Sequence, residues 1–268
     1  AAVTERQGSV VFAPAGEEDW TELPLNRPLT QADRLWTDQG ARVELHTGNA
    51  RVYLDDLSNL GIVELDDRST HLSLTQGTLE ASVRDLQGGE RFEVGTPNVA
   101  VRGAPNAEWR LDVNPDTAST RVTVRSGQVT VLGDGGRAAT LGTGQQVTFV
   151  ARDLEQVEAD RRGRDGFDQW VAEHDRREAQ SVTAQYVPPE VIGSQQLDIH
   201  GTWSQDATYG PVWYPNVTVA DWAPYRYGHW AWVNPWGWTW IDDAPWGFAP
   251  FHYGRWIERD DRWAWVPQ

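Results

Sequence analysis

The chain has 268 residues and a net charge of −16, and it contains neither cysteine nor lysine. This length suits one large domain or two ordinary ones. An acidic chain without a basic patch lacks the chemistry that binds nucleic acid, and a chain without cysteine forms neither disulfide bonds nor thiolate metal sites. No run of about twenty apolar residues could span a bilayer, so we expect no transmembrane segment.

The first residues are small, at Ala1 and Ala2, and no charged and then apolar leader precedes the rest of the chain. Removal of a signal peptide leaves such a start. We therefore expect the mature form of an exported protein, in the periplasm or outside the cell.

Residues 1–150 are predicted to form an all-β domain. Apolar and polar residues alternate in ARVELHTG (41–48), THLSLTQGTLEASV (70–83) and TRVTVRSGQVTVLG (120–133). Glycines fall between these runs at the spacing of turns. The pattern is typical of a β-sandwich or β-roll.

Residues 151–185 are predicted to form a charged linker followed by one short amphipathic helix. Phe167, Trp170 and Val171 recur at helical spacing. Asp165 is a suitable N-cap, with Asp168 three residues later. Because the helix has a single apolar stripe, we expect this stripe to pack on a β domain.

Residues 186–268 are predicted to form a Trp-rich module of repeated β-hairpins. Three similar units begin at Gly201, Gly228 and Gly254, and each resembles two strands joined by a turn. Twelve of the sixteen tryptophans of the chain lie in these units, which contain no leucine. Aromatic rings must therefore build the core of the module.

The turn of the second hairpin decides which way its tryptophans face. A three-residue loop, 235–237, with Gly237 at positive φ pairs Trp232 with Trp240. The same loop places Trp230 and Trp238 on their face. In the third hairpin, an even loop centred on residues 260 and 261 pairs the two outer tryptophans. We expect seven strand tryptophans to be core: Trp230, Trp232, Trp238, Trp240, Trp256, Trp263 and Trp265.

Two stretches of the chain resemble known families. TPNVAVRG from Thr96, TRVTVRSGQVTVLG and LGTGQQVTF resemble the FecR domain family over about residues 40–150. This resemblance implies an all-β module of bacterial periplasmic regulators and surface proteins. QYVPPEVIG, GPVWYP, WAPYRYGHW, PWGFAPFHYGRW and WAWVP are similar to an uncharacterised Trp-rich family that follows FecR-like domains in exported proteins.

Nineteen aromatic residues from position 201 onward exceed what so small a core can hide, so we expect some of them to form an exposed binding surface beside basic side chains. The candidate residues are Trp222, Tyr225, Arg226, Tyr227, His229, Trp236, Trp246, His252, Tyr253 and Arg255. The expected function is a non-catalytic binding or assembly module of the cell envelope, with a polysaccharide, a protein or a second copy of the chain as partner.

Two other functions stay open. The FecR resemblance implies a signalling or regulatory module. A glycan-active enzyme is the third alternative, because acidic pairs occur at Asp242–Asp243 and Asp260–Asp261 beside aromatic rings. Acidic pairs at hairpin ends are more often solvated turn residues, and no nucleophile elbow, phosphate loop or zinc motif is present. We therefore expect no catalytic residues, no metal and no cofactor.

Overall fold

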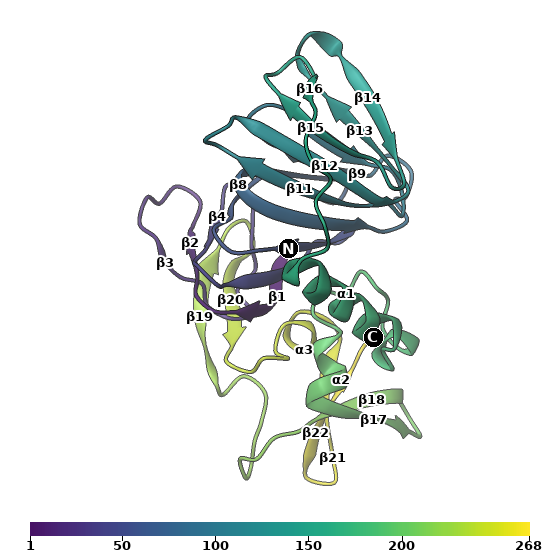
Figure 1. Ribbon diagram of the computed structural model, residues 1–268. Coiled ribbons are helices and arrows are strands. Elements are labelled where there is room, and N and C mark those ends of the chain that lie inside the picture. The colour runs from purple at the N-terminus through teal and green to yellow at the C-terminus, as the bar shows by residue number, and fades with distance from the viewer. The chain divides into compact units, whose positions relative to one another are not determined.

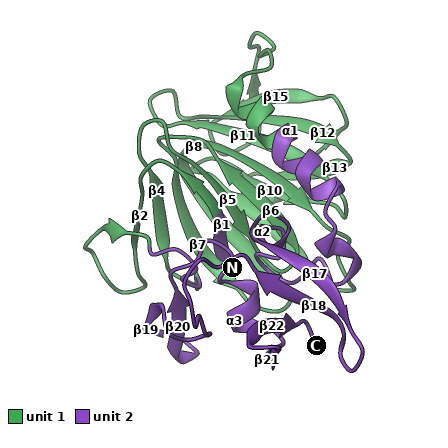
Figure 2. Cartoon of the chain, turned by 90° about the horizontal axis from the view of Figure 1, so that it is seen from below, with its two compact units in different colours: residues 1, 5–23, 29–171 green, residues 2–4, 24–28, 172–268 purple.

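The computed structural model describes residues 1–268, with twenty-two strands and three α-helices (Figure 1). Two compact units divide the chain, and Figure 2 shows them in different colours. Unit 1 comprises residues 1, 5–23 and 29–171, and unit 2 comprises residues 2–4, 24–28 and 172–268. The expected architecture, mainly β with a helix and then Trp-rich hairpins, is confirmed.

The strands up to the first α-helix are β1 (Ala2–Gln7), β2 (Val10–Ala13), β3 (Thr21–Glu22), β4 (Arg34–Thr37), β5 (Arg42–His46), β6 (Ala50–Leu54), β7 (Asn59–Leu65), β8 (Ser69–Val83), β9 (Arg91–Gly95), β10 (Ala100–Gly103), β11 (Glu108–Asn114), β12 (Ser119–Ser126), β13 (Gln128–Leu132), β14 (Ala138–Gly142), β15 (Gln146–Val150) and β16 (Glu155–Val157). A 3-10 turn, η1 (Asp134–Gly136), joins β13 to β14. The main strand order is β14-β13-β10-β9-β8-β11-β12-β15-β16.

The strands of unit 1 form two layers, and the long strand β8 runs through both of them. Its first half, up to Gln76, pairs with β7 and β9, and its second half, from Gly77, pairs with β6 and β11. Gly77 has a φ of +100°, and a Cβ atom there would lie 2.3 Å from the Ser58 hydroxyl. A glycine is therefore required where the strand passes from one layer to the other.

The core of unit 1 is mostly aliphatic, as the alternating strands predict. Leu45, Leu72, Leu111 and Val122 are fully buried. Inward-facing leucines and valines recur at every second position along the strands, which fills the space between two packed layers.

Helix α1 (Gly166–Ala179) begins where the sequence predicts. The Asp165 side chain accepts a hydrogen bond from the Asp168 N–H at 2.9 Å, and the Asp168 side chain accepts one from the Asp165 N–H at 3.1 Å. This reciprocal pair is a capping box. Phe167 and Val171 are buried against Tyr53 of β6, so the predicted docking of the helix on the β domain is confirmed.

Buried ion pairs also hold the start of α1. The Arg110 guanidinium on β11 donates to Asp165 and Asp168, each at 2.9 Å. Arg125 and Arg162 contact the same Asp168 carboxylate. Burial opposes ionisation of Asp168. Hydrogen bonds from the Arg162 guanidinium and from the Asp165 N–H nevertheless hold the pKa of this carboxyl well below its usual range. The charged linker is thus anchored at Arg162.

Unit 2 contains a 3-10 turn η2 (Thr183–Gln185), two further short helices and three hairpins. Their bounds are α2 (Gln196–His200), β17 (Gly201–Asp206), β18 (Gly210–Pro215), β19 (Gly228–Val233), β20 (Gly237–Asp242), α3 (Ala249–His252), β21 (Arg255–Arg259) and β22 (Arg262–Val266). The first and third hairpins join into one sheet of order β17-β18-β22-β21, whereas β19 and β20 pair only with each other. Figure 1 shows the β19–β20 hairpin apart from the four-stranded sheet.

The glycine that begins each repeat lies against a buried tryptophan of the second strand. A Cβ atom on Gly201 would lie 2.2 Å from Trp213, one on Gly228 would lie 2.8 Å from Trp240, and one on Gly254 would lie 2.8 Å from Trp265. The three indoles are 0%, 7% and 0% exposed. The same Cβ atoms would lie 2.3 Å from the Ile241 carbonyl at Gly228 and 2.1 Å from the Val266 carbonyl at Gly254. The repeated glycine therefore leaves room for an indole and, in the second and third repeats, for a backbone carbonyl.

The core of unit 2 is built around these three indoles, together with Val187, Leu197, Trp246 and Phe251. Each indole N–H has a partner: Trp213 donates to the Leu197 carbonyl at 2.9 Å, Trp265 to the Tyr253 carbonyl at 2.8 Å, and Trp240 to the Asp242 carboxylate at 3.0 Å. The aromatic core expected for this part of the chain is thus present.

Two segments from the start of the chain complete unit 2. Ala2 is buried with Ile192 and Phe248. The Asn26 amide donates to the Asp242 carbonyl at 2.9 Å and to the Ala244 carbonyl at 2.6 Å. These contacts fix the connector between the second and third hairpins.

Candidate binding surface

The second hairpin places its strand tryptophans on one face. Val233 pairs with Gly237 across a loop of residues 234–236, so Trp232 lies opposite Trp238 and Trp230 lies opposite Trp240. The expected pairing of Trp232 with Trp240 is therefore wrong by two residues. Because a shift of two keeps the side chains on the same side, the expected common face is present. Gly237 has a φ of +84°, as predicted.

Four indoles of this hairpin are exposed. Trp230 is 57% exposed, Trp232 58% and Trp238 67%, and Trp236 in the loop is 59% exposed. We call β19, β20 and their loop, Gly228–Asp242, the tryptophan hairpin. The prediction that Trp230, Trp232 and Trp238 are core is wrong, because no third strand or helix packs on this two-stranded sheet at their positions.

Indoles pair across the hairpin, Trp232 with the likewise exposed Trp238 and Trp230 with the buried Trp240. The Trp232 and Trp238 rings lie 5.8 Å apart at 89°, and the Trp230 and Trp240 rings lie 5.5 Å apart at 67°. Such edge-to-face pairs add about 0.5–1.5 kcal/mol each beyond area burial. The Trp232 indole also donates to the Asn234 side chain at 3.2 Å. The face is therefore preformed.

The opposite face of the hairpin contains two buried aliphatic side chains. Val233 and Ile241 on that face are each 1% exposed. An alternation with tryptophans on one side and aliphatic residues on the other is apolar on both sides. In the sequence, only this aliphatic pair indicated that the tryptophan side of the hairpin faces solvent.

Four of the predicted surface residues are exposed: Tyr225, Arg226 and Tyr227, which directly precede the tryptophan hairpin, and His229 in its first strand. The Tyr225 ring lies 5.9 Å from Trp240, and this partial burial raises the pKa of Tyr225. The Tyr227 carbonyl accepts a hydrogen bond from the Asp243 N–H at 3.0 Å. These residues are continuous with the hairpin.

Trp246 is not a surface residue, contrary to the prediction. Its side chain is 4% exposed, and its ring lies 5.1 Å from Trp213 and 5.7 Å from Trp222. Trp222 is half-buried in the same cluster. A connector tryptophan is buried here because the connector folds back over the core, which strand alternation cannot indicate.

The last three predicted residues lie outside the tryptophan hairpin, in α3, directly after it and in β21. His252 stacks on Phe248 at 4.3 Å, and burial lowers the pKa of His252 to about 4. Tyr253 is half-buried and its carbonyl accepts the Trp265 indole N–H. Arg255 is exposed, with its guanidinium 5.1 Å from the Tyr209 ring.

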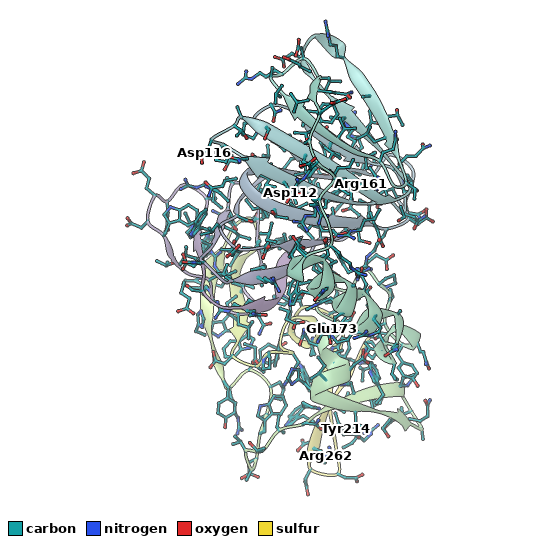
Figure 3. All side chains as sticks on the ribbon, in the orientation of Figure 1. Asp112, Asp116, Arg161, Glu173, Tyr214 and Arg262 are labelled. Atoms are coloured by element: carbon teal, nitrogen blue, oxygen red, sulfur yellow. The ribbon has the colours of Figure 1, made fainter.

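The outer side of the four-stranded sheet has further arginine–tyrosine contacts. Arg259 also lies over Tyr209, at 5.0 Å, and Arg262 lies 4.5 Å from the Tyr214 ring (Figure 3 labels Tyr214 and Arg262). Arg259 in addition forms an ion pair with Asp206 at 2.9 Å. The arginines of this face thus contact tyrosine rings or a carboxylate of the same face, as is typical of a solvated sheet surface.

The acidic pair Asp242–Asp243 divides into a buried and an exposed residue. The Asp242 carboxylate accepts the Trp240 indole N–H and the Ala244 N–H, each at 3.0 Å. Burial raises the pKa of Asp242, and these hydrogen bonds oppose the rise. The contacts give Asp242 a structural role in the connector.

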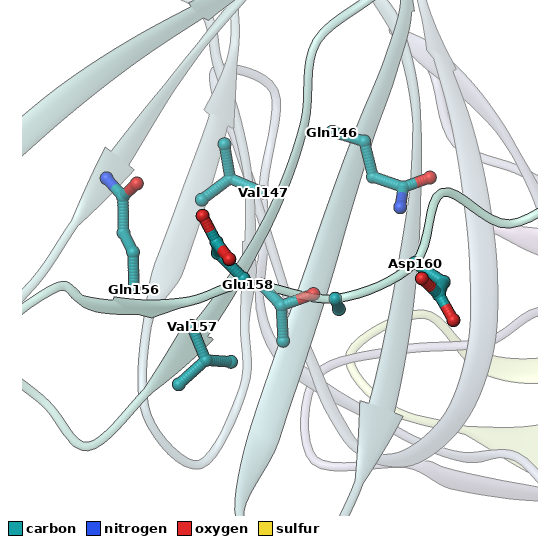
Figure 4. Close-up of a pocket in the computed structure, with 8 residues that line it drawn as sticks. Gln146, Val147, Gln156, Val157, Glu158 and Asp160 are labelled. Atoms are coloured by element: carbon teal, nitrogen blue, oxygen red, sulfur yellow. The ribbon is translucent and has the colours of Figure 1, made fainter.

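A polar hollow of about 630 Å³ lies in unit 1 beside β15 and β16 (Figure 4). Its lining includes Gln146, Gln156, Glu158 and Asp160. The two carboxylates are solvent-exposed, and no buried polar side chain is among the lining residues. The hollow therefore has none of the desolvated groups typical of a catalytic or ligand site.

Comparison with known families confirms both resemblances. Residues 33–130 match the family described as FecR protein, and residues 194–268 match a family of unknown function, DUF6600. The matches fall in the order expected from the sequence. No curated protein matches the chain.

Two solved structures resemble part of the fold. Both are crystal structures of a proposed anti-sigma factor from Parabacteroides distasonis ATCC 8503, at 1.65 Å and 2.50 Å resolution. Their sequence identities with the chain are 16% and 15%, and both TM-scores are 0.41. Each match covers 47% of this chain and 59% of that protein. Among the helices of the structure, none is long and apolar enough to cross a membrane.

Proposed function

Because the chain combines a FecR domain at residues 33–130 with a DUF6600 domain at residues 194–268, we propose that it is a non-catalytic regulatory module that acts by docking outside the cytoplasm. FecR-like domains occur in periplasmic regulators, and this part of the proposal rests on that resemblance. The docking part rests on the chain itself.

The observation that carries the docking role is the exposed face of the tryptophan hairpin. Its four indoles are each more than half exposed, at 57–67%. With about 150–250 Å² per aromatic side chain, they present about 400–600 Å² of mostly apolar surface. Exposed apolar patches of this size mark interaction sites. The polar hollow of unit 1 offers no comparable surface.

A genetic experiment tests the regulatory role. A strain lacking the gene should show altered transcription of a defined gene set, and a strain carrying Trp232→Ser, Trp236→Ser and Trp238→Ser together should show the same change. Trp20→Ser is the matched control, because Trp20 is 39% exposed and lies in unit 1.

Unchanged transcription in the deletion strain would overturn the regulatory function. Wild-type transcription in the triple variant, with the protein present at its normal amount, would overturn the role of the hairpin but leave the regulatory function intact.

Glycan binding is a second candidate function, favoured by Trp236. This indole is 59% exposed in the loop, beside the exposed Asn234, which offers a hydrogen-bonding amide. A flat ring with polar neighbours is suited to stacking on a sugar. Saturable quenching of tryptophan fluorescence by peptidoglycan or exopolysaccharide, weakened by Trp236→Ala, would support this candidate. Absence of quenching would exclude these two polymers.

A further inference from the structure

We propose that the tryptophan hairpin seats its indole face in the interfacial layer of a lipid bilayer with zwitterionic headgroups. This inference rests on the docking role of the hairpin proposed above and names the surface to which it docks.

The first argument is the distribution of charge. The chain has a net charge of −16, yet no Asp, Glu or Arg lies between Trp230 and Ile241. A charged side chain taken out of water is costly, whereas an indole combines a large apolar ring with one N–H donor. Tryptophan is accordingly enriched at membrane–water interfaces. The hairpin thus has the composition of an interfacial segment within an otherwise highly charged chain.

The second argument is the backbone. Six residue pairs from Gly228–Asp242 to Val233–Gly237 join the two strands. Cross-strand pairing satisfies inward-directed backbone groups, and water in the headgroup layer can satisfy those at the two outer edges. The edge-to-face indole pairs and Gly237 at the turn hold the face in place. The hairpin can therefore enter the interface without refolding.

The third argument is the size and shape of the face. A standard protein interface takes about 800 Å² from each partner, and the indoles present about 400–600 Å². The Trp232 and Trp238 rings meet at 89°, so they do not form a flat platform for a sugar chain. A second copy would bring together two chains that each have a net charge of −16. A lipid layer needs neither a matching shape nor a flat platform.

The charge of the chain also predicts which lipids bind. Anionic headgroups repel an acidic protein, and salt screens the repulsion, with a Debye length of about 10 Å at 0.1 M. Binding to phosphatidylcholine vesicles should therefore be stronger than binding to vesicles that contain phosphatidylglycerol. The difference should shrink as the salt concentration rises.

The experiment uses the full chain and vesicle flotation. We expect the wild-type protein to float with phosphatidylcholine vesicles, and brominated phosphatidylcholine to quench its tryptophan fluorescence. The triple variant Trp232→Ser, Trp236→Ser, Trp238→Ser should lower the partition coefficient at least tenfold. Trp20→Ser, outside the hairpin, should leave it unchanged. The three single hairpin variants repeat the test with smaller losses if the triple variant does not fold, as judged by circular dichroism.

Absence of wild-type flotation, or equal flotation of the wild type and a folded hairpin variant, would overturn the proposal. Trp-dependent dimerisation or saturable glycan quenching without vesicle binding would overturn it in favour of a second copy or a polysaccharide. These results leave the transcription experiment unaffected, so failure of lipid binding and failure of the regulatory function are distinguishable.

Discussion

The second and third hairpins of unit 2 are copies of one repeat, but they treat their tryptophans differently. Trp240 and Trp265 hold equivalent positions beneath a repeat glycine, and both are buried. Trp238 is 67% exposed, whereas Trp263, its equivalent in the third hairpin, is half-buried. Strand β22 pairs with β18, and β20 has no strand partner besides β19.

The difference shows that one indole near the end of each repeat is buried in the core. Whether the other tryptophans of a repeat are buried depends on which strand pairs with their hairpin. In the third hairpin, Trp265 lies opposite both Trp213 and Trp256, and the sheet continues on both sides of β22. In the second hairpin, β19 and β20 pair only with each other. Trp232 and Trp238 there contact each other across the strands and remain exposed to solvent.

The largest expected effect separates the two kinds of tryptophan. Trp265→Ala should lower the free energy of unfolding of unit 2 by about 3–5 kcal/mol, because it leaves a cavity in the aromatic core. Trp238→Ala should cost less than about 1.5 kcal/mol, the value of one edge-to-face pair. Chemical denaturation of the full chain, followed by tryptophan fluorescence, measures both. Equal losses in the free energy of unfolding would mean that Trp238 contributes to packing as much as the core residue Trp265 does.

The next effect tests the turn that aligns the exposed face. Gly237→Val should lower the free energy of unfolding by about 1–3 kcal/mol, because valine is strained at a φ of +84°. Gly237→Asn is the control and should cost less, since asparagine tolerates the left-handed region. A similar cost for both variants, measured by thermal unfolding, would argue against backbone strain as the cause.

A smaller effect tests the connector between the two hairpins. Asn26→Ala removes donors to the Asp242 and Ala244 carbonyls and should lower the free energy of unfolding by about 1–2 kcal/mol. Hydrogen exchange should show faster opening of residues 242–247 than of β22. Uniform acceleration across unit 2 would mean that Asn26 acts on the whole unit and not on the connector.

The smallest effect concerns the Arg259–Asp206 ion pair of the four-stranded sheet, which has no counterpart in the tryptophan hairpin. The Arg259 guanidinium, together with hydrogen bonds from the Thr208 and Tyr209 N–H groups, lowers the pKa of Asp206 to about 2, from an ordinary value of 3.8. Because the folded pKa lies below the unfolded one, the pair favours folding above about pH 4, and its contribution is lost as the pH falls toward 2.

Titration of the Asp206 carboxyl by NMR checks this assignment. In Arg259→Gln the pKa of Asp206 should rise toward its ordinary value. An unchanged pKa would leave the hydrogen bonds from the Thr208 and Tyr209 N–H groups as the cause of the shift.

The sequence by itself determined the local features of the molecule. Alternation predicted the strands of unit 1, and the Asp165 and Asp168 spacing predicted the start of α1. The positive φ of Gly237 was also predicted, whereas the bounds of the loop and the pairing of Trp232 were not. Each of these depends on residues within a few positions of one another, whose geometry is fixed by chain connectivity and steric limits. The family resemblances were likewise readable from short motifs.

Only the tertiary structure decided which aromatic residues meet solvent. Trp246 was predicted to be exposed and is buried, and Trp232 was predicted to be core and is exposed. Both residues are tryptophans in similar local sequence, so the periodicity of the sequence does not distinguish the buried one from the exposed one. Burial is set by the elements that pack alongside, and these come from distant parts of the chain: Trp246 meets Trp213, thirty-three residues away, while β19 and β20 find no further strand.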